Sequence, residues 1–247
     1  MITKDMLRTA SKKKGLTNTG QMEKDYFQDL FLYHIYKKTN NLVFKGGTCL
    51  YKLYNLPRFS EDLDFTMTGE MDIEKLIGDI ANKTGSEIKS IKRIKKSLLI
   101  KIGFKGIITN YNTLRIDISS ENIVFGYDVL NYVPPYIDIN PFSLRVLNLK
   151  EIIAEKIHAI FAREKARDLY DLFFLLRFVE PDKDVIEKKL RIFDMSFDFH
   201  EFKRNANKLK DIWVPEMKPF VLIELVSFEV ARDFVFEKLS EKPTQMK

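Results

Sequence analysis

The sequence predicts an α+β protein in which a core of helices and strands is followed by an all-helical C-terminal domain. Apolar runs and polar–apolar alternation recur up to Ser119, three prolines lie between residues 134 and 141, and the apolar period beyond them becomes helical. The 247 residues are 45% hydrophobic, which is ample for a large core and excludes a disordered chain. We expect two domains, residues 1–145 and 146–247.

Helical and extended patterns alternate in the first half. Apolar residues three and four apart predict a helix over 21–36, and the apolar run 42–44 predicts a short strand before the pair Gly46-Gly47. Thr48 can cap a helix that runs through Asn55 and is stopped by Pro57. The remaining patterns predict strands over 62–67, 98–104 and 113–118, and a helix over 72–83.

The second half has only helical patterns. Apolar residues between 149 and 161 form one stripe, and residues 169–178 are apolar nearly all round, which predicts a buried helix. A last long helix is predicted over 219–239.

The charge and the cysteine content limit the binding partners and the cellular compartment that we expect for the protein. The net charge is +6, and residues 1–147 hold 22 basic and 16 acidic residues against 19 of each afterwards, which favours a polyanionic partner of the first half. The single cysteine, Cys49, excludes an internal disulfide and a cysteine-based zinc site. No secretory pattern and no apolar run of about 18 residues is present, so we expect a cytoplasmic protein with no membrane partner.

Asp62 and Asp64 are the first candidates for chemistry. Residues two apart on a strand share a face, so both carboxylates project together while Leu63 and Phe65 turn to the core. Carboxylates placed in this way can hold Mg²⁺ or Mn²⁺ ions that stabilise an in-line phosphoryl displacement. Asp117 alternates with apolar neighbours on a later predicted strand and can supply a third carboxylate, which would complete the cation cage or accept a proton.

The glycine pair complements this carboxylate set. A turn without side chains lets backbone N–H groups approach a phosphate, and the following helix N-terminus favours negative charge. Gly46, Gly47 and Thr48 are therefore candidate nucleotide-binding residues. Each motif alone is commonly structural, since Gly-Gly is often only a turn and surface Asp pairs are frequent.

A basic run at residues 89–96 holds five positive charges and no acid. Such a run is usually a solvated edge, but it is also the best candidate for an RNA phosphate track. The candidate RNA-binding residues are Lys92, Arg93, Lys95 and Lys96.

Five motifs follow one another between residues 40 and 176. They are Gly46-Gly47-Thr48; Arg58-x-Ser60-x-Asp62-Leu63-Asp64-Phe65; Asp117; Glu155-Lys156-Ile157-His158-Ala159 with Arg163; and Arg167-Asp168-Leu169-Tyr170-Asp171-Leu172. This set resembles the AbiEii/AbiGii-type nucleotidyltransferase toxins, which belong to the DNA polymerase β-like nucleotidyltransferase superfamily. The resemblance implies a polymerase β-like core with a mixed sheet, joined to a helical domain. It also implies a nucleoside triphosphate substrate and a separately encoded antitoxin.

Carried over by position, the resemblance adds Lys156 and Asp168 to the catalytic set of Asp62, Asp64 and Asp117. It also implies nucleotide binding by the basic and hydroxyl residues of the motifs. These are Arg58, Ser60, Lys156, Arg163 and Arg167. If one helix ran unbroken through them, Lys156, Arg163 and Arg167 would share a stripe that could grip a triphosphate or an RNA backbone; the alternative is a solvated helix face. No motif is assigned to residues 180–247.

The primary hypothesis is a metal-dependent enzyme that transfers a nucleoside monophosphate to an acceptor hydroxyl and releases pyrophosphate. An RNA, in particular the 3′ end of a tRNA, is the preferred acceptor, in keeping with the resemblance to toxins. The alternatives are a nucleotidyltransferase that modifies a protein side chain or a small molecule, and a catalytically silent module that binds nucleic acid or a partner. The sequence leaves open the nucleotide, the acceptor, the oligomeric state and the mode of antitoxin action.

Overall fold

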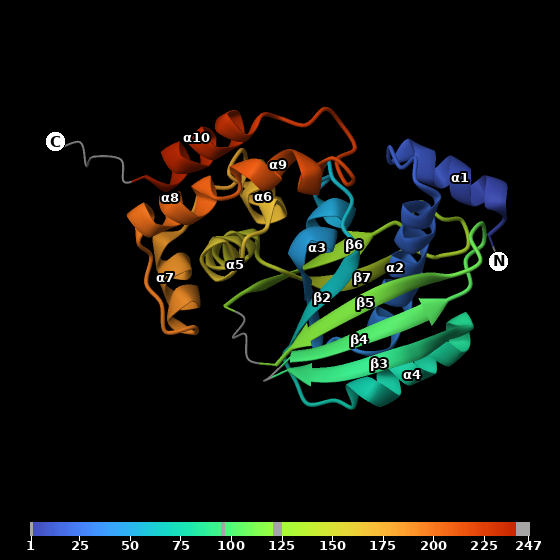
Figure 1. Ribbon diagram of the computed structural model, residues 1–247. Helices are drawn as coiled ribbons and strands as arrows, with labels where there is room; N and C mark the ends of the chain where they lie inside the picture. The colour runs from blue at the N-terminus through green and yellow to red at the C-terminus, as the bar shows by residue number, and fades with distance from the viewer. Residues whose placement is uncertain (1, 95–96, 121–124, 241–247) are drawn as a thin grey trace. The chain divides into compact units, whose positions relative to one another are not determined.

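Two compact units make up the chain in the computed structural model, which describes residues 2–94, 97–120 and 125–240. The first unit is Met1–Leu147 and the second is Asn148–Lys247. The mixed sheet lies in the first unit, and the described elements of the second are all helices, so the predicted α+β class is confirmed (Figure 1). The expected domain boundary after residue 145 falls inside the last strand of the first unit.

A seven-stranded sheet organises the described part of the first unit. Its strands are β1 Leu42–Lys45, β2 Asp62–Met67, β3 Ser86–Ile94, β4 Ser97–Phe104, β5 Asn112–Ser119, β6 Tyr127–Tyr132 and β7 Phe142–Leu147. They lie in the order β3-β4-β5-β2-β1-β7-β6. The pairs β2–β5 and β1–β7 are parallel and the other neighbours are antiparallel. The four predicted strands agree with β1, β2, β4 and β5 to within one residue at each end.

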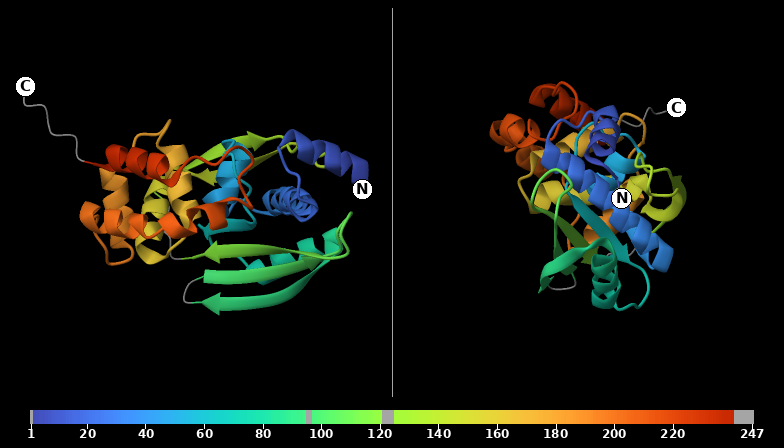
Figure 2. Two further views of the ribbon diagram at one scale, coloured as in Figure 1. Left: turned by 45° about the horizontal axis from the view of Figure 1, so that its top comes forward. Right: turned by 90° about the vertical axis from the view of Figure 1, so that its right-hand side faces the viewer.

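Four helices accompany this sheet in the described residues. They are α1 Lys4–Lys13, α2 Thr19–Lys38, α3 Gly46–Leu53 and α4 Ile73–Thr84. The Asn18 side chain caps α2, and Asp72 caps α4, which ends at Gly85 with φ +65°. Helices α2 and α4 contact each other and pack against one face of the sheet, behind the strands in Figure 1 and beside them in Figure 2.

The apolar alternation of the strands fills the layer between that face and the two helices. Leu63 and Phe65 of β2, Ile100 of β4 and Ile116 of β5 are fully buried there. The residues between them on each strand point to the opposite face, which we call the open face. The open face carries the three aspartates of the motifs, Asp62, Asp64 and Asp117.

Four described elements of the first unit, α1, β3, β6 and β7, were not predicted. Strand β3 is an exposed edge strand, and a bulge between Ile88 and Ser90 breaks its alternation, so its sequence reads as a charged run. Helix α1 is mostly exposed and buries only Leu7, Ala10 and Ser11, too few residues for a clear apolar stripe.

Six helices form the described part of the second unit. They are α5 Leu149–Ala162, α6 Ala166–Leu175, α7 Lys183–Arg191, α8 Phe199–Asn207, α9 Lys210–Met217 and α10 Phe228–Leu239. The single long helix predicted over 219–239 is wrong, because α10 begins only after the Ser227 cap. The indole N–H of the buried Trp213 donates to the Val226 carbonyl at 3.0 Å, which satisfies the backbone of this non-helical segment.

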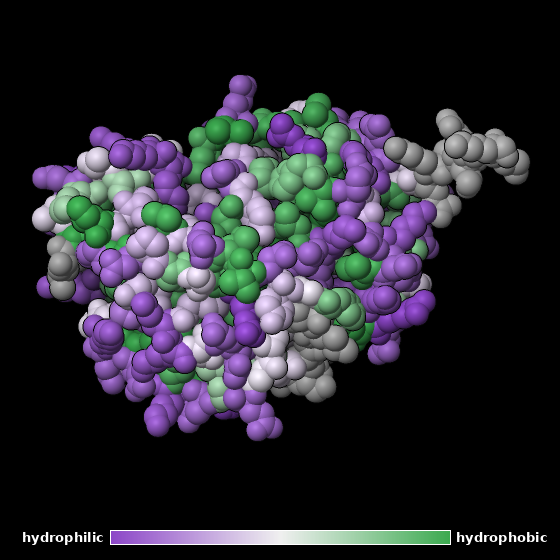
Figure 3. Space-filling model, turned by 180° about the vertical axis from the view of Figure 1, so that it is seen from behind, coloured by the Kyte–Doolittle hydropathy of each residue, from purple (hydrophilic) through white to green (hydrophobic). Residues whose placement is uncertain are grey.

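Hydrophobic side chains on the surface are interspersed with hydrophilic ones, as the view from behind shows (Figure 3). Val129, Val133 and Ile137 are among the most exposed large apolar residues. Over residues 2–94, 97–120 and 125–240, none of the helices combines the length and the apolar character needed to cross a bilayer.

Candidate active site

Gly46 joins the first strand to the helix that follows it. Strand β1 ends at Lys45, α3 begins at Gly46, and the φ of Gly46 is +76°, a conformation that other residues adopt at a cost. A Cβ at this position would overlap the Asp64 carboxylate. The absence of a side chain therefore serves both the turn and the close approach of Asp64 to the start of α3.

Gly47 is enclosed by two other motif residues. A Cβ here would lie 2.5 Å from a guanidinium nitrogen of Arg58 and 2.8 Å from the Ser60 hydroxyl. Arg58 is 2% exposed and donates to the Phe59 carbonyl at 3.1 Å, while the Ser60 carbonyl accepts from Gln28 at 2.8 Å. Arg58 and Ser60 support the glycine turn from within the protein, and their contact with a nucleotide stays a prediction.

Thr48 lies in the first turn of α3. The predicted cap at Thr48 is wrong, because the helix begins two residues earlier with Lys45 in the cap position. The Thr48 side chain is fully buried and its hydroxyl donates to the Asp62 carbonyl. The hydroxyl thus connects α3 to the start of β2. The nucleotide-binding role of Thr48 stays a prediction, which now depends on the position of Thr48 in the N-terminal turn of the helix.

The three candidate carboxylates lie on the open face. Strands β2 and β5 are parallel, with Asp64 directly opposite Asp117 and Asp62 opposite Arg115. Directly opposed residues share a face, so this register brings Asp64 and Asp117 side by side, with Asp62 in the neighbouring row. The alternation of buried Leu63, Phe65, Ile116 and Ile118 with these half-buried carboxylates agrees with the pattern expected from the sequence.

Arg115 modifies the carboxylate set. Its guanidinium forms an ion pair with Asp62, whose side chain is 27% exposed. In the part of the chain that the structure describes, no three His, Cys, Asp or Glu side chains converge as a metal cage would require. Asp64 and Asp117 nevertheless offer the oxygen donors that Mg²⁺ takes, which is usually held by one or two carboxylates together with substrate phosphates.

A buried network of charges holds the C-terminal turn of α3 in place. The Lys52 ammonium of α3 lies 2.6 Å from an Asp25 oxygen and 2.7 Å from an Asp29 oxygen, and all three side chains are fully buried. Lys14 pairs with Asp25 at 3.0 Å, and the Tyr132 hydroxyl donates to Asp29. This network was not predicted from the sequence. Its one indication in the sequence is that Asp25 and Asp29 lie among the apolar residues of α2.

The two buried carboxylates respond differently to this environment. Burial by itself raises the pKa of both. The charges of Lys52 and Lys14 outweigh burial at Asp25 and hold its pKa below the usual value, whereas burial dominates at Asp29 and raises its pKa.

A second cluster belongs to the helical unit. The Lys156 ammonium of α5 lies 2.9 Å from Asp168 and 2.6 Å from Asp171 of α6, and Arg163 donates two hydrogen bonds to Asp168 at 2.9 and 3.1 Å. The Lys156 side chain is 10% exposed and that of Arg163 is 58% exposed. The structure thus brings together three predicted residues and adds Asp171, whose signal was its position one helical turn after Asp168.

Asp168 is the ionic centre of this cluster. Burial would raise its pKa, but the charges of Lys156 and Arg163 and their hydrogen bonds outweigh burial and hold the pKa well below the usual value. Asp168 is therefore an anion that fixes two cations, one buried and one exposed.

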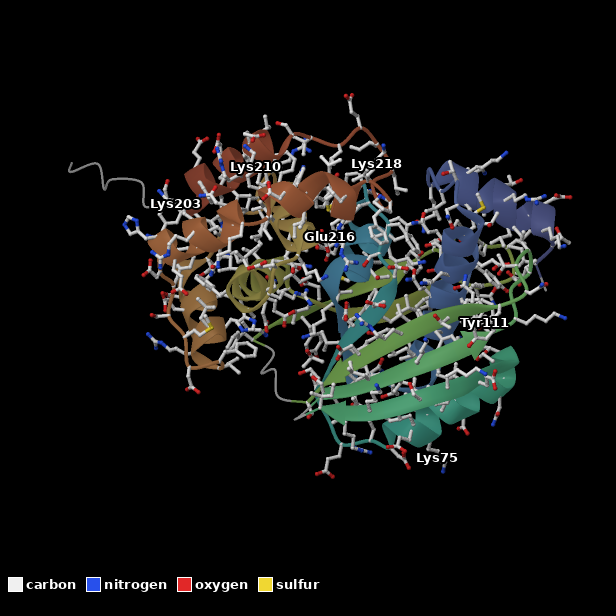
Figure 4. All side chains as sticks on the ribbon, in the orientation of Figure 1. Lys75, Tyr111, Lys203, Lys210, Glu216 and Lys218 are labelled. Carbon is white, nitrogen blue, oxygen red and sulfur yellow. The ribbon has the colours of Figure 1, made fainter. Side chains whose placement is uncertain are left out.

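The continuous cationic stripe considered for this region does not form. Helix α5 ends at Ala162, Arg163 is extended, and α6 begins at Ala166. Arg167 lies 3.4 Å from Glu216 of α9, which also accepts from the Ala166 backbone N–H at 2.7 Å (Figure 4). Arg167 is thus separate from the Lys156 cluster, and its role in nucleotide binding stays a prediction.

The basic run is divided by its strand. Lys92 opposes Leu99 and points to the open face, whereas Arg93 opposes the buried Leu98 and pairs with Glu74 of α4 on the other side. Lys95 and Lys96 lie outside the described residues.

A mixed sheet followed by a helical unit is also the fold of nucleotidyltransferases of known structure. The fold is similar to that of JHP933 from Helicobacter pylori, at 22% identity and a TM-score of 0.63 over 90% of this chain and 91% of that one. MenT4, a nucleotidyltransferase toxin of Mycobacterium tuberculosis, gives a TM-score of 0.70 at 19% identity over 97% and 89% of the two chains. The comparison with curated proteins found no match.

The sequence identifies the family directly. The family described as "Nucleotidyl transferase AbiEii toxin, Type IV TA system" matches residues 30–241. The chain therefore belongs to the AbiEii nucleotidyltransferase toxin family, as the motifs indicated.

Proposed function

We propose that the protein is a metal-dependent nucleotidyltransferase that moves a nucleoside monophosphate from a triphosphate to a hydroxyl of an RNA, in particular the 3′ end of a tRNA. The observation that carries the proposal is the register that sets Asp64 beside Asp117, with the Asp64 carboxylate against Gly46. Membership of the AbiEii family supports nucleotidyl transfer and a toxin role, with a separately encoded antitoxin as the partner.

The proposed reaction is a substitution at the α-phosphorus of the triphosphate. The acceptor oxygen forms a bond to this phosphorus, the bond to the bridging oxygen breaks, and pyrophosphate leaves. Asp117 would accept the proton that the acceptor hydroxyl loses. The glycine turn and the N-terminus of α3 offer backbone N–H groups to the phosphates.

Asp64 and Asp117 would hold the divalent ion, Mg²⁺ or Mn²⁺, and Asp62 would join them after leaving Arg115. The bound ion would neutralise charge on the phosphates and stabilise the attacking and leaving oxygens. The donor set fits this ion because all three groups are carboxylates on one face of the sheet.

Lys156 of the helical unit is assigned to the triphosphate, as the resemblance implies, and Asp168 to the orientation of Lys156 and Arg163. The contacts support this division of roles. The Asp168 side chain is 2% exposed and is engaged by two cations, whereas the Lys156 side chain keeps 10% exposure.

Incubation of the purified protein with Mg²⁺, each labelled triphosphate in turn and total RNA tests the proposal. Asp64→Asn should keep the fold, because the change is isosteric, and should lose at least about 10²-fold in transfer, because charge leaves the metal cage. Asp79→Asn is the matched control, since Asp79 is an exposed carboxylate on α4. Label that enters protein instead of RNA would assign the acceptor to the alternative class, and a folded Asp64→Asn variant with normal transfer would refute the metal role of Asp64.

A further inference from the structure

The open face of strands β3, β4 and β5 holds cations that the proposed chemistry does not use. Strand β4 buries Leu98, Ile100 and Ile102 toward the helices, so Leu99 and Lys101 point to the open face. Lys101 opposes Arg115, which opposes Asp62. In the next row Lys92 opposes Leu99, which opposes Asp117. The cations and the candidate metal ligands therefore share one face.

The register also sets the distance between them. Neighbouring strands lie about 4.8 Å apart, so the Lys101 backbone is roughly 10 Å from that of Asp62 and the Lys92 backbone is roughly 14 Å from that of Asp64. A strand of a few nucleotides covers this span. Lys92 and Lys101 are exposed and form no ion pair within the described ranges, whereas Arg115 is engaged by Asp62.

An aromatic platform continues this row of cations. The bulge in β3 leaves Lys89 as an extra residue, which lies over Gly103 of β4 together with Tyr111. A Cβ on Gly103 would be 2.7 Å from Lys89 Cε and 2.6 Å from the Tyr111 hydroxyl, so the missing side chain provides the space for both. The Lys89 ammonium lies 5.6 Å from the Tyr111 ring centre, and Tyr111 is 52% exposed.

We propose that Lys89, Lys92, Lys101 and Tyr111, which we call the open-face track, bind the single-stranded RNA segment that directly precedes the acceptor hydroxyl. The inference rests on the proposed function and adds the surface that recognises its substrate. Exposed lysines beside an exposed aromatic ring match the way in which proteins hold single strands, with phosphates on the cations and bases stacked on the rings. Lys89 also forms an ion pair with Glu87 of the same strand, so Lys92 and Lys101 are the cations of the track that carry the proposal. The position of the track on the carboxylate face directs the end of such a strand toward Asp64 and Asp117.

The basic run at residues 89–96 and the open-face track are different sets of residues, so they predict different effects of mutation. The run at 89–96 includes Arg93, which faces the helices, and lacks Lys101 and Tyr111, which belong to other strands or loops. Figure 4 labels Tyr111 at the end of the sheet where β4 leads into β5, and Lys75 on α4, away from the open face. These positions provide a charge-matched control.

The test compares Lys92→Gln/Lys101→Gln with Lys75→Gln/Lys83→Gln, which removes two exposed charges from α4. Binding of 5′-fluorescein-labelled tRNA is followed by fluorescence anisotropy at several salt concentrations. The track variant should bind more weakly and lose roughly 1.4 units of the log–log salt slope, the amount expected for two phosphate contacts on a single strand. The α4 variant should keep the wild-type slope.

Transfer kinetics provide a second measurement. The track variant should raise KM for tRNA and keep kcat and the KM for the triphosphate, because the contacts hold the acceptor equally before and during reaction. Tyr111→Ala should weaken tRNA binding at least about fivefold, and Tyr111→Phe should restore it.

Three outcomes would overturn the inference. Equal salt slopes for both double variants would show that charge acts only at long range. A wild type that transfers nucleotides to tRNA while the track variant matches it would reject the track and leave the proposed function standing. A wild type that binds and modifies no RNA would remove the proposed acceptor, and with it the track.

Discussion

Gly46 meets two structural requirements at once. Its φ of +76° is one that L-residues avoid, and the Asp64 carboxylate occupies the place of a side chain. The turn and the site therefore depend on the same missing atom.

Gly46→Ala should reduce nucleotidyl transfer by about 10²-fold, because the new methyl group displaces the Asp64 carboxylate from its position. The control is Gly78→Ala in α4, where a Cβ meets nothing within 4 Å. This control should retain activity and gain about 1 kcal/mol in the free energy of unfolding. Transfer assays and thermal unfolding of both variants check the prediction, and a fully active Gly46→Ala protein would contradict it.

At the scale of residues, much of the candidate site was predictable and some of it was not. Alternation alone placed Asp62, Asp64 and Asp117 on one face, because their apolar neighbours must turn to the core. The opposition of Asp64 to Asp117 was not predictable, since it depends on strand register. The burial of Arg58 was also hidden, because an arginine in a loop gives no sign that Gly47 lies against it.

At the scale of elements, α3 connects the site to the interior. Its N-terminus carries Gly46 and Thr48, and its C-terminal turn places Lys52 among fully buried carboxylates. The helix is thus fixed at both ends, by the Thr48 hydroxyl on Asp62 and by Lys52 on Asp25 and Asp29.

Lys52→Met should lower the free energy of unfolding by about 3–5 kcal/mol, because the buried Asp29 loses the cation that compensates its burial. Removal of both partners, Lys52→Met with Asp29→Leu, should cost less than the single change, since Asp25 keeps Lys14 as its partner. Lys83→Met on the exposed side of α4 should have little effect. Urea unfolding of the three variants tests this order, and a double variant less stable than the single one would contradict the pairing.

The elements that the sequence missed have identifiable causes. A bulge and a charged edge hide β3, because its alternation breaks at Lys89. The break between α5 and α6 contains neither Gly nor Pro, so no local signal marks Arg163 as extended. It arises in the structure where Arg163 and Lys156 converge on Asp168, which is a tertiary effect.

At the scale of the whole molecule, the fold class followed from the change of apolar period, since a period of two and a period of 3.6 cannot be confused over long segments. The order of the strands could not be predicted from this pattern. Four of the pairings in the described sheet either join strands that are not consecutive in the chain or involve a strand that was not predicted. The two units also differ in their electrostatics. Asp25 and Asp29 of the first unit have pKa shifts of opposite sign, whereas Asp168 of the second has a lowered pKa.

This difference predicts that acid destabilises the second unit. A carboxyl with a lowered folded-state pKa stabilises the fold above its unfolded pKa, and this contribution is lost as the pH falls toward the folded value. Burial opposes the lowered pKa of Asp168, but Lys156 and Arg163 outweigh it. The urea midpoint should therefore fall below about pH 5. Fluorescence of Trp213, the one tryptophan of the chain, reports this unit.

Asp168→Asn separates this effect from general acid sensitivity. The variant should be less stable at neutral pH and should show a flatter pH dependence below about pH 5, because its side chain does not titrate. Asp211→Asn, an exposed change on α9, should follow the wild type. Parallel pH curves for the wild type and Asp168→Asn would show that the ionic cluster makes no net contribution to folding.

Strand β3 has a consequence for solubility as well as for ligand binding. It forms one edge of the described sheet, where backbone N–H and C=O groups can recruit a strand from another molecule. Its basic residues, Lys89, Lys92 and Arg93, make such association unfavourable, because positive charges would meet along the joined edges. We therefore expect the lysines of this strand to oppose association between copies of the protein. A related chain that acts on another acceptor would still need charge at these positions to avoid aggregation.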